Sequence, residues 1–117
     1  MARRLTPLSH QAFAEICARL DAGSADRADL RAATMHLAAL LVAKAPGASV
    51  EVRIPPFAAV QCIAGARHTR GTPPAVVEMD APTWIALGRG RLGWSEATVR
   101  ASGERSDLSA LLPLDEA

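Results

Sequence analysis

The chain has 117 residues and a formal net charge of +1, with acidic and basic residues mixed along its length, and half of its residues are apolar. This length is enough for one domain with one hydrophobic core, and too short for two. The charge is nearly balanced and aromatic residues are few (two Trp, two Phe, no Tyr), so no nucleic-acid partner is expected.

No membrane span or signal peptide is expected. The most apolar segment, residues 35–45, carries His36 and Lys44 and is well short of the roughly 20 apolar residues that cross a bilayer. The basic N-terminus lacks a following apolar stretch. Cys17 and Cys62 are too few for a disulfide framework, so a reduced, cytoplasmic location fits best.

Residues 7–45 are predicted to form two helices. Residues 7–20, "PLSHQAFAEICARL", place apolar residues near one helical face, with Pro7 in the first turn. The second helix runs from about residue 27 to 45, is entered through Ser24 or Asp26, and stops at "PG". Its broad apolar face is wide enough to lie on a sheet.

From Ser49 onward the sequence predicts strands, because the hydrophobic period changes from about 3.6 to 2. In "SVEVRI", Val50, Val52 and Ile54 point one way and the polar residues the other. The turn at Pro55-Pro56 leads into "FAAVQCI", which favours an antiparallel hairpin. The segment "AVVEM" is predicted as a third strand.

Short helices and one more strand are expected after Asp80, which can cap the helix "APTWIALGRG" that ends at Gly88 or Gly90. "GWSEATV" suggests a helical turn, with Ser95 as its cap if the turn begins there. "VRASG" is a short fourth strand, and "LSALL" a last helix that Ser106 or Asp107 can cap.

This order predicts a single α+β domain over residues 1–117, with two N-terminal helices in 7–45 and a sheet with C-terminal helices in 49–114. We expect a mainly antiparallel sheet of about four to five strands, with the helices packed on one face. The space between the sheet and the helices is where such a domain could hold an apolar molecule.

The tail "VVEMDAPTWIALGRGRLGWSEATVRASGERSDLSALLPL" resembles the end of sterol-carrier-protein-like domains. With "VEVRIPPFAAVQCI" and "RHTRGTPP", the chain is similar to the short bacterial branch, the bacterial sterol carrier family proteins, over most of residues 7–114. The resemblance implies a sterol-carrier-like fold with a hydrophobic tunnel, and binding of a lipid, fatty acyl chain or sterol-like molecule.

The same architecture resembles the C-terminal part of mycothiol-dependent maleylpyruvate isomerases, whose chemistry is attributed to a preceding metal-binding helical bundle. Here about 45 residues precede the first strand, and they offer only His10 and His36, on different predicted helices. No HExxH or CxxC spacing occurs. No metal, cofactor or catalytic residue is therefore expected.

The loop at residues 65–74 has three interpretations. Arg67 and Arg70 could grip a carboxylate or phosphate with His68 as a further donor, or His68 could serve an enzyme. Alternatively, Gly71 and the two prolines after it only fix the approach to the next strand. The structural interpretation leads, and catalysis is the weakest because no nucleophile and oriented base stand together.

Non-catalytic binding of an apolar or amphipathic small molecule is the leading functional prediction. Its polar mouth would consist of Arg67, His68 and Arg70. The predicted apolar walls are Met35, Leu37, Leu41, Phe57, Val60, Trp84, Leu87 and Trp94. The alternative is a structural or protein-interaction module, such as a homodimer formed through exposed strand edges or the short C-terminal helix, with a packed interior and an apolar surface patch.

Overall fold

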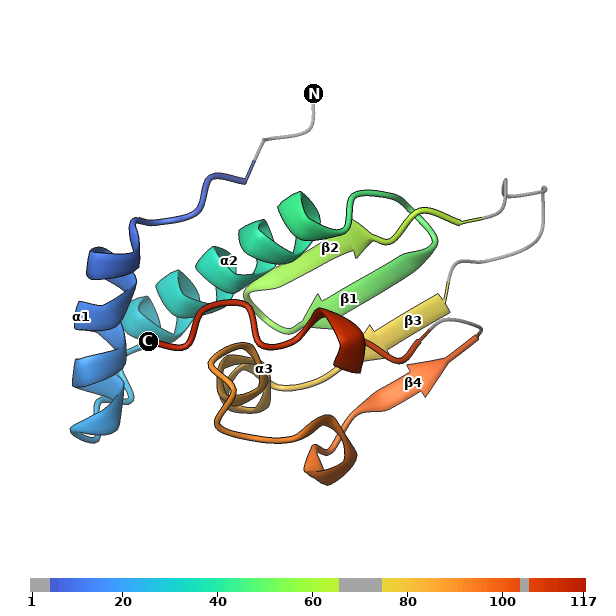
Figure 1. Ribbon diagram of the computed structural model, residues 1–117. Coiled ribbons are helices and arrows are strands. Elements are labelled where there is room, and N and C mark those ends of the chain that lie inside the picture. The colour runs from blue at the N-terminus through green and yellow to red at the C-terminus, as the bar shows by residue number, and fades with distance from the viewer. Residues whose placement is uncertain (1–4, 66–74, 104–105) are drawn as a thin grey trace.

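The computed structural model describes residues 5–65, 75–103 and 106–117 of the chain, and Figure 1 shows their arrangement. Its elements in chain order are α1 (His10–Asp21), α2 (Arg27–Lys44), β1 (Val50–Ile54), β2 (Ala58–Cys62), β3 (Ala75–Glu78), α3 (Ala81–Gly88), the 3₁₀ helix η1 (Trp94–Glu96), β4 (Arg100–Ser102) and the 3₁₀ helix η2 (Ser109–Leu111). The predicted α+β class and the predicted order of helices and strands are confirmed.

The four described strands form one mixed sheet in the order β2-β1-β3-β4. The predicted hairpin is present, since β1 and β2 pair antiparallel, and β3 and β4 pair antiparallel as well. The two central strands, β1 and β3, are parallel, which the sequence analysis did not predict. Val50, at the start of β1, lies opposite both Cys62 at the end of β2 and Ala75 at the start of β3. Strand β2 therefore ends beside the start of β1, and β3 begins there and runs in the direction of β1.

Capping side chains set the beginnings of the first two helices. The hydroxyl of Ser9 accepts a hydrogen bond from the amide of Ala12 at 3.1 Å, so α1 begins at His10, later than predicted. The carboxylate of Asp26 accepts one from the amide of Ala28 at 3.0 Å and starts α2 as predicted. Each cap satisfies an amide that has no partner within its own helix.

Two of the later caps form as predicted, and a third does not. Asp80 caps α3 through the amide of Thr83 at 2.9 Å, and hydrogen bonds from Thr83 lower the pKa of this carboxyl. Asp107 accepts the amide of Ser109 at 2.8 Å, at the entry to η2. η1 begins one residue before Ser95, behind a glycine, so the cap considered for Ser95 does not form.

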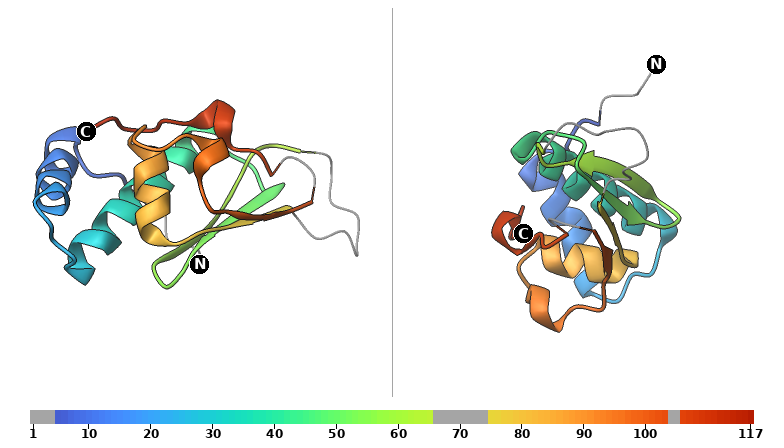
Figure 2. Two further views of the ribbon diagram at one scale, coloured as in Figure 1. Left: turned by 90° about the horizontal axis from the view of Figure 1, so that it is seen from below. Right: turned by 90° about the vertical axis from the view of Figure 1, so that its right-hand side faces the viewer.

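The core lies between one face of the sheet and the helices, which Figure 2 shows on the same side of the strands. Val50, Val52 and Ile54 are fully buried, whereas Arg53 between them is exposed, as the alternation in β1 predicts. The largest fully buried side chains across all the described elements are Trp84, Phe13, Leu37, Leu41, Ile54, Leu87 and Leu108. Large side chains therefore fill the space between the sheet and the helices.

Helix α3 approaches α2 closely at Gly88. A Cβ atom at this position would lie 2.7 Å from Cδ1 and 2.9 Å from Cδ2 of the buried Leu37. The carbonyl of Gly88 accepts hydrogen bonds from the amides of Leu114 at 2.8 Å and Asp115 at 3.0 Å. The same glycine thus fixes both the packing of two helices and the position of the C-terminal segment.

Both cysteines are buried free thiols, in agreement with the sequence analysis. Burial raises the pKa of Cys62 to about 11, and burial is also the main cause of the raised pKa of Cys17. The reactive species is the thiolate, so both thiols are unreactive in the folded protein near neutral pH.

We expect Gly88→Ala to lower the free energy of unfolding in urea by about 1 kcal/mol or more. Overpacking costs about 1–3 kcal/mol, and the better helix propensity of alanine, about 1 kcal/mol, offsets only part of it. The control is Gly93→Ala, whose new Cβ meets the Glu96 carboxylate at 3.1 Å, the end of a flexible exposed side chain. This control should stay within about 0.5 kcal/mol of the wild type. Equal stability of both variants would contradict a tight contact at Gly88.

We expect a thiol reagent to leave both cysteines unlabelled at about pH 8 and to label both in urea. The folded-state pKa of Cys62 lies above the unfolded value of 9.0, so its contribution to stability is present below about pH 9 and is lost as the pH rises toward 11. Cys62→Val, which cannot titrate, should lose stability less steeply across that window. Rapid labelling of the native protein would show that a thiol is accessible.

Candidate functional site

The candidate site is a half-open apolar groove of about 890 Å³ beside the edge strand β2. Three parts of the chain form it: helix α2, strand β2 and the N-terminal segment of residues 5–9, which we call the strap. The lining residues are Leu5, Pro7, Met35, Ala39, Val42, Ala43, Pro46, Phe57, Ala58, Ala59, Val60 and Gln61. In Figure 1, β2 runs beside the later turns of α2, and the strap leads from α1 toward the N-terminus.

Helix α2 builds the groove with a second apolar face. Leu37 and Leu41 are fully buried in the core. The groove face has the spacing of helical neighbours, with Met35, Ala39 and Ala43 at successive intervals of four residues. Two of these three side chains are single methyl groups, so this side of the helix leaves open volume beside the strand.

The strand side of the groove is the open edge of β2. A strand presents alternate side chains to opposite faces of its sheet. Here the consecutive residues 57–61 all line the groove, so it follows the edge of the strand as well as one face. Among the described strands β2 has β1 as its only neighbour, which leaves this edge without a described strand beside it.

The lining is apolar, and polar groups lie toward the two ends of the strand. Gln61 is the one lining residue with a polar side chain. At the other end of the strand, the exposed guanidinium of Arg27 lies over the ring of Phe57, 5.2 Å from its centroid. The arrangement provides an apolar channel with an amide near one end and a cation near the other.

The structure brings together three of the eight predicted wall residues, since Met35, Phe57 and Val60 all line the groove. The five others lie elsewhere: Leu37, Leu41, Trp84 and Leu87 are fully or almost fully buried in the core, and Trp94 is a partly buried residue packed against it. Sequence periodicity identifies apolar faces but does not say which of them meets another element.

The predicted polar mouth of Arg67, His68 and Arg70 lies outside the described residues. Sequence reasoning did not select Leu5, Pro7, Ala39, Ala43 or Arg27. Ala39 and Ala43 belong to a second, alanine-rich stripe on α2, which could be found only once the core face of that helix was known.

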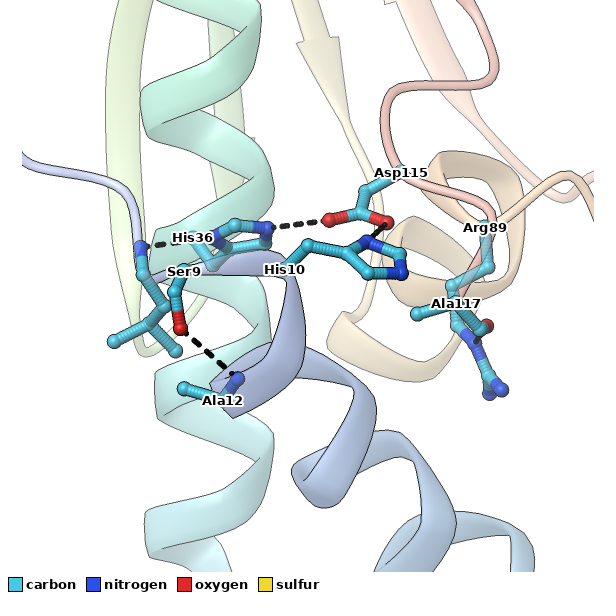
Figure 3. A network of polar contacts seen from close by, with 8 residues as sticks. Ser9, His10, Ala12, His36, Arg89, Asp115 and Ala117 are labelled. Carbon is cyan, nitrogen blue, oxygen red and sulfur yellow. Dashed lines mark hydrogen bonds and ion pairs between the residues drawn. The ribbon is translucent and has the colours of Figure 1, made fainter.

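A polar network ties the strap to the rest of the molecule, as Figure 3 shows. The amide of Leu8 donates to Nδ1 of His36 at 2.9 Å, and Nε2 of the same ring lies 3.0 Å from a carboxylate oxygen of Asp115. The second oxygen of Asp115 lies 2.8 Å from Nδ1 of His10. A carboxylate can only accept, so Nε2 of His36 donates to Asp115, and Nδ1 of the same ring accepts from the Leu8 amide. The neutral ring of His36 therefore carries its proton on Nε2.

Burial distinguishes the two histidines of this network. The side chain of His36 is only 2% exposed and stacks on the ring of Phe13, with 4.3 Å between the ring centroids. The side chain of His10 is 71% exposed. Asp115 joins them across 79 and 105 residues of sequence, a separation that no sequence motif indicates.

The described residues contain no cluster of three or more His, Cys, Asp or Glu side chains that could hold a metal ion. Within the same part of the chain, no helix combines the length and apolar character needed to cross a membrane. The groove offers apolar contact, with an amide near one end and a guanidinium near the other.

Comparison with known proteins yields one family. No curated protein matches the chain significantly. The model of the family SCP_3, described as "Bacterial SCP ortholog", matches residues 26–114, from the cap of α2 through the last 3₁₀ helix. This match covers well over half of the chain, and the chain therefore belongs to the bacterial SCP ortholog family.

Proposed function

We propose that the protein binds the apolar part of a lipid-like small molecule in the groove between α2, β2 and the strap, without chemical conversion. The observation that carries the proposal is the groove itself, whose volume of about 890 Å³ lies within the roughly 300–1,000 Å³ of small-molecule sites. Membership in a sterol-carrier-type family supports a carrier role.

The driving force would be burial of hydrocarbon against the groove lining. Each buried methylene contributes about 0.8 kcal/mol to the free energy of binding, and ordering of the ligand and of the site offsets part of this. The lining offers few hydrogen-bonding side chains, so it favours a hydrocarbon chain over a sugar or a nucleotide.

A polar head group would project toward an end of the groove. Arg27 beside Phe57 can pair with a carboxylate or phosphate without being buried. Arg67, His68 and Arg70, which follow β2 in the sequence, stay proposed as a second polar mouth. In this proposal Leu37, Leu41, Trp84 and Leu87 support the groove from the core behind it.

One observation favours a second candidate, a protein-interaction module. Five consecutive residues of the groove belong to β2 or directly precede it, along an edge where another extended chain could add by main-chain hydrogen bonding. Association of two copies through this edge would make a homodimer. The experiment that tests the lipid proposal also separates the two candidates.

We expect native mass spectrometry to show a monomer that binds one fatty acid per chain. Affinity should rise from decanoate to dodecanoate to tetradecanoate by roughly tenfold per step while the groove still accepts methylenes. An apo dimer that ignores fatty acids would overturn the lipid proposal and support the interaction module.

Ala43→Phe should weaken dodecanoate binding by about tenfold or more, because the exposed Ala43 lines the groove and a phenyl ring fills part of its volume. The matched control is Ala18→Phe at an exposed position of α1 outside the groove lining, which should bind as the wild type does. Equal binding by both variants would place the ligand elsewhere.

Arg27→Gln should weaken dodecanoate binding by up to about fivefold and leave dodecanol binding unchanged, since an exposed charge pair is worth up to about 1 kcal/mol. The control is Arg100→Gln, an exposed residue on β4, the edge strand at the opposite side of the sheet. If Arg27→Gln changes neither ligand, the head group leaves the groove at another point.

A further inference from the structure

The strap is a wall of the groove that lies outside the sheet and the helices. Leu5 and Pro7 line the groove, and the amide of the next residue, Leu8, donates to His36. Leu8 itself is 38% exposed, the one exposed large hydrophobic residue among the described residues. The attachment of the strap to α2 at this point is therefore a main-chain hydrogen bond to a titratable ring.

We propose that His36 is a proton-controlled latch for the strap, so that a second proton on its ring releases Leu8 and opens the groove. The neutral ring accepts from Leu8 through Nδ1 and donates to Asp115 through Nε2. The doubly protonated ring has two donors and no acceptor. The Leu8 amide would then face a second N–H at 2.9 Å, and the strap would lose its partner on α2.

Asp115 makes the charged ring acceptable at this buried position. Its carboxylate lies on the Nε2 side of His36 at 3.0 Å and stays paired when the ring becomes a cation. The second proton on the ring thus strengthens the bond to the C-terminal segment and breaks the bond to the strap. Gly88, whose carbonyl accepts from the amide of Asp115, holds the carboxylate in place.

Within residues 5–65, 75–103 and 106–117, the other charged and titratable groups named near this ring lie beyond Asp115 or are neutral. From α1, the exposed His10 shares the carboxylate, and the buried thiol of Cys17 stays protonated because burial raises its pKa. From α3, Arg89 pairs with Asp21 and donates to the carbonyl of Ala117 (Figure 3). Strand β2, which also packs against α2, contributes no charged side chain. His36 is thus the titratable ring that contacts the strap directly.

Only the consequence of the latch, the release of a ligand, rests on the proposed function. Its mechanical part can be measured on the full chain without any ligand. The experiment follows the ring nitrogens of His36 and the exchange protection factor of the Leu8 amide by NMR, from about pH 7.5 to about pH 5, the range in which histidines titrate.

We expect the Leu8 protection factor to fall by about fivefold as the nitrogen shifts show His36 becoming charged, which corresponds to the loss of one hydrogen bond. In His36→Gln the protection should not change over this range. His10→Gln, which removes the exposed ring and keeps His36, should retain the change. Dodecanol, which does not titrate, should bind about fivefold more weakly at the lower pH in the wild type and in His10→Gln, but not in His36→Gln.

Two results would overturn the latch: constant protection of Leu8 while His36 charges, or a pH-dependent change that persists in His36→Gln. If His36→Gln does not fold, the wild type decides alone, by whether the protection of Leu8 changes as His36 becomes charged. Failure of dodecanol and fatty acids to bind at either pH would instead overturn the proposed function, and the Leu8 measurement would still decide the latch.

Discussion

The close approach of α3 to α2 at Gly88 is the contact on which the rest of the structure depends. The absence of a side chain lets Leu37 occupy the space a Cβ would fill, and the carbonyl of the buried Gly88 accepts hydrogen bonds from the C-terminal segment. That segment brings Asp115 to His36, and His36 holds Leu8. Hydrogen bonds thus link Gly88 to Asp115, Asp115 to His36, and His36 to Leu8. This series connects the α2–α3 contact with the strap that forms one wall of the groove.

Helix α2 has two apolar faces with different tasks. One face, with Leu37 and Leu41, is fully buried against the sheet and α3. The other, with Ala39 and Ala43, lines the groove. Leu37 and Leu41 fill the core, whereas the single methyl groups of Ala39 and Ala43 leave space beside the strand. This arrangement explains how a domain with a packed interior can still offer volume to an apolar molecule.

The sequence predicted the elements well because their signals are local. Alternation in "SVEVRI" and the carboxylates of Asp26 and Asp80 each act over a few residues, and the structure confirms them. The parallel pairing of β1 with β3 could not be predicted, because it depends on where the chain returns after β2. The hydrogen bond from His36 to Asp115 spans 79 residues, and periodicity carries no information at that distance.

The same reasoning explains why the site was only partly predicted. Trp84 and Leu87 were expected to form walls because they are large and apolar, yet these properties favour full burial, which is where the structure places them. Groove residues such as Ala39 and Pro7 are small or lie outside regular elements, and nothing in their local sequence distinguishes them. Predicting them requires knowing which face of α2 the core has already used.

A groove with one wall outside the core also bears on how a carrier could load and release its ligand. Opening a site enclosed by α2, α3 and the sheet would expose Trp84, Phe13 and their neighbours, at about 1.5–3 kcal/mol for each large side chain. Moving the strap breaks the hydrogen bond from Leu8 to His36, a cost of about 1 kcal/mol, and uncovers the partly buried Leu5, while the fully buried core side chains stay covered. In the proposed carrier, exchange of the ligand would therefore proceed at the strap, while the stability of the domain would reside in the packing behind it.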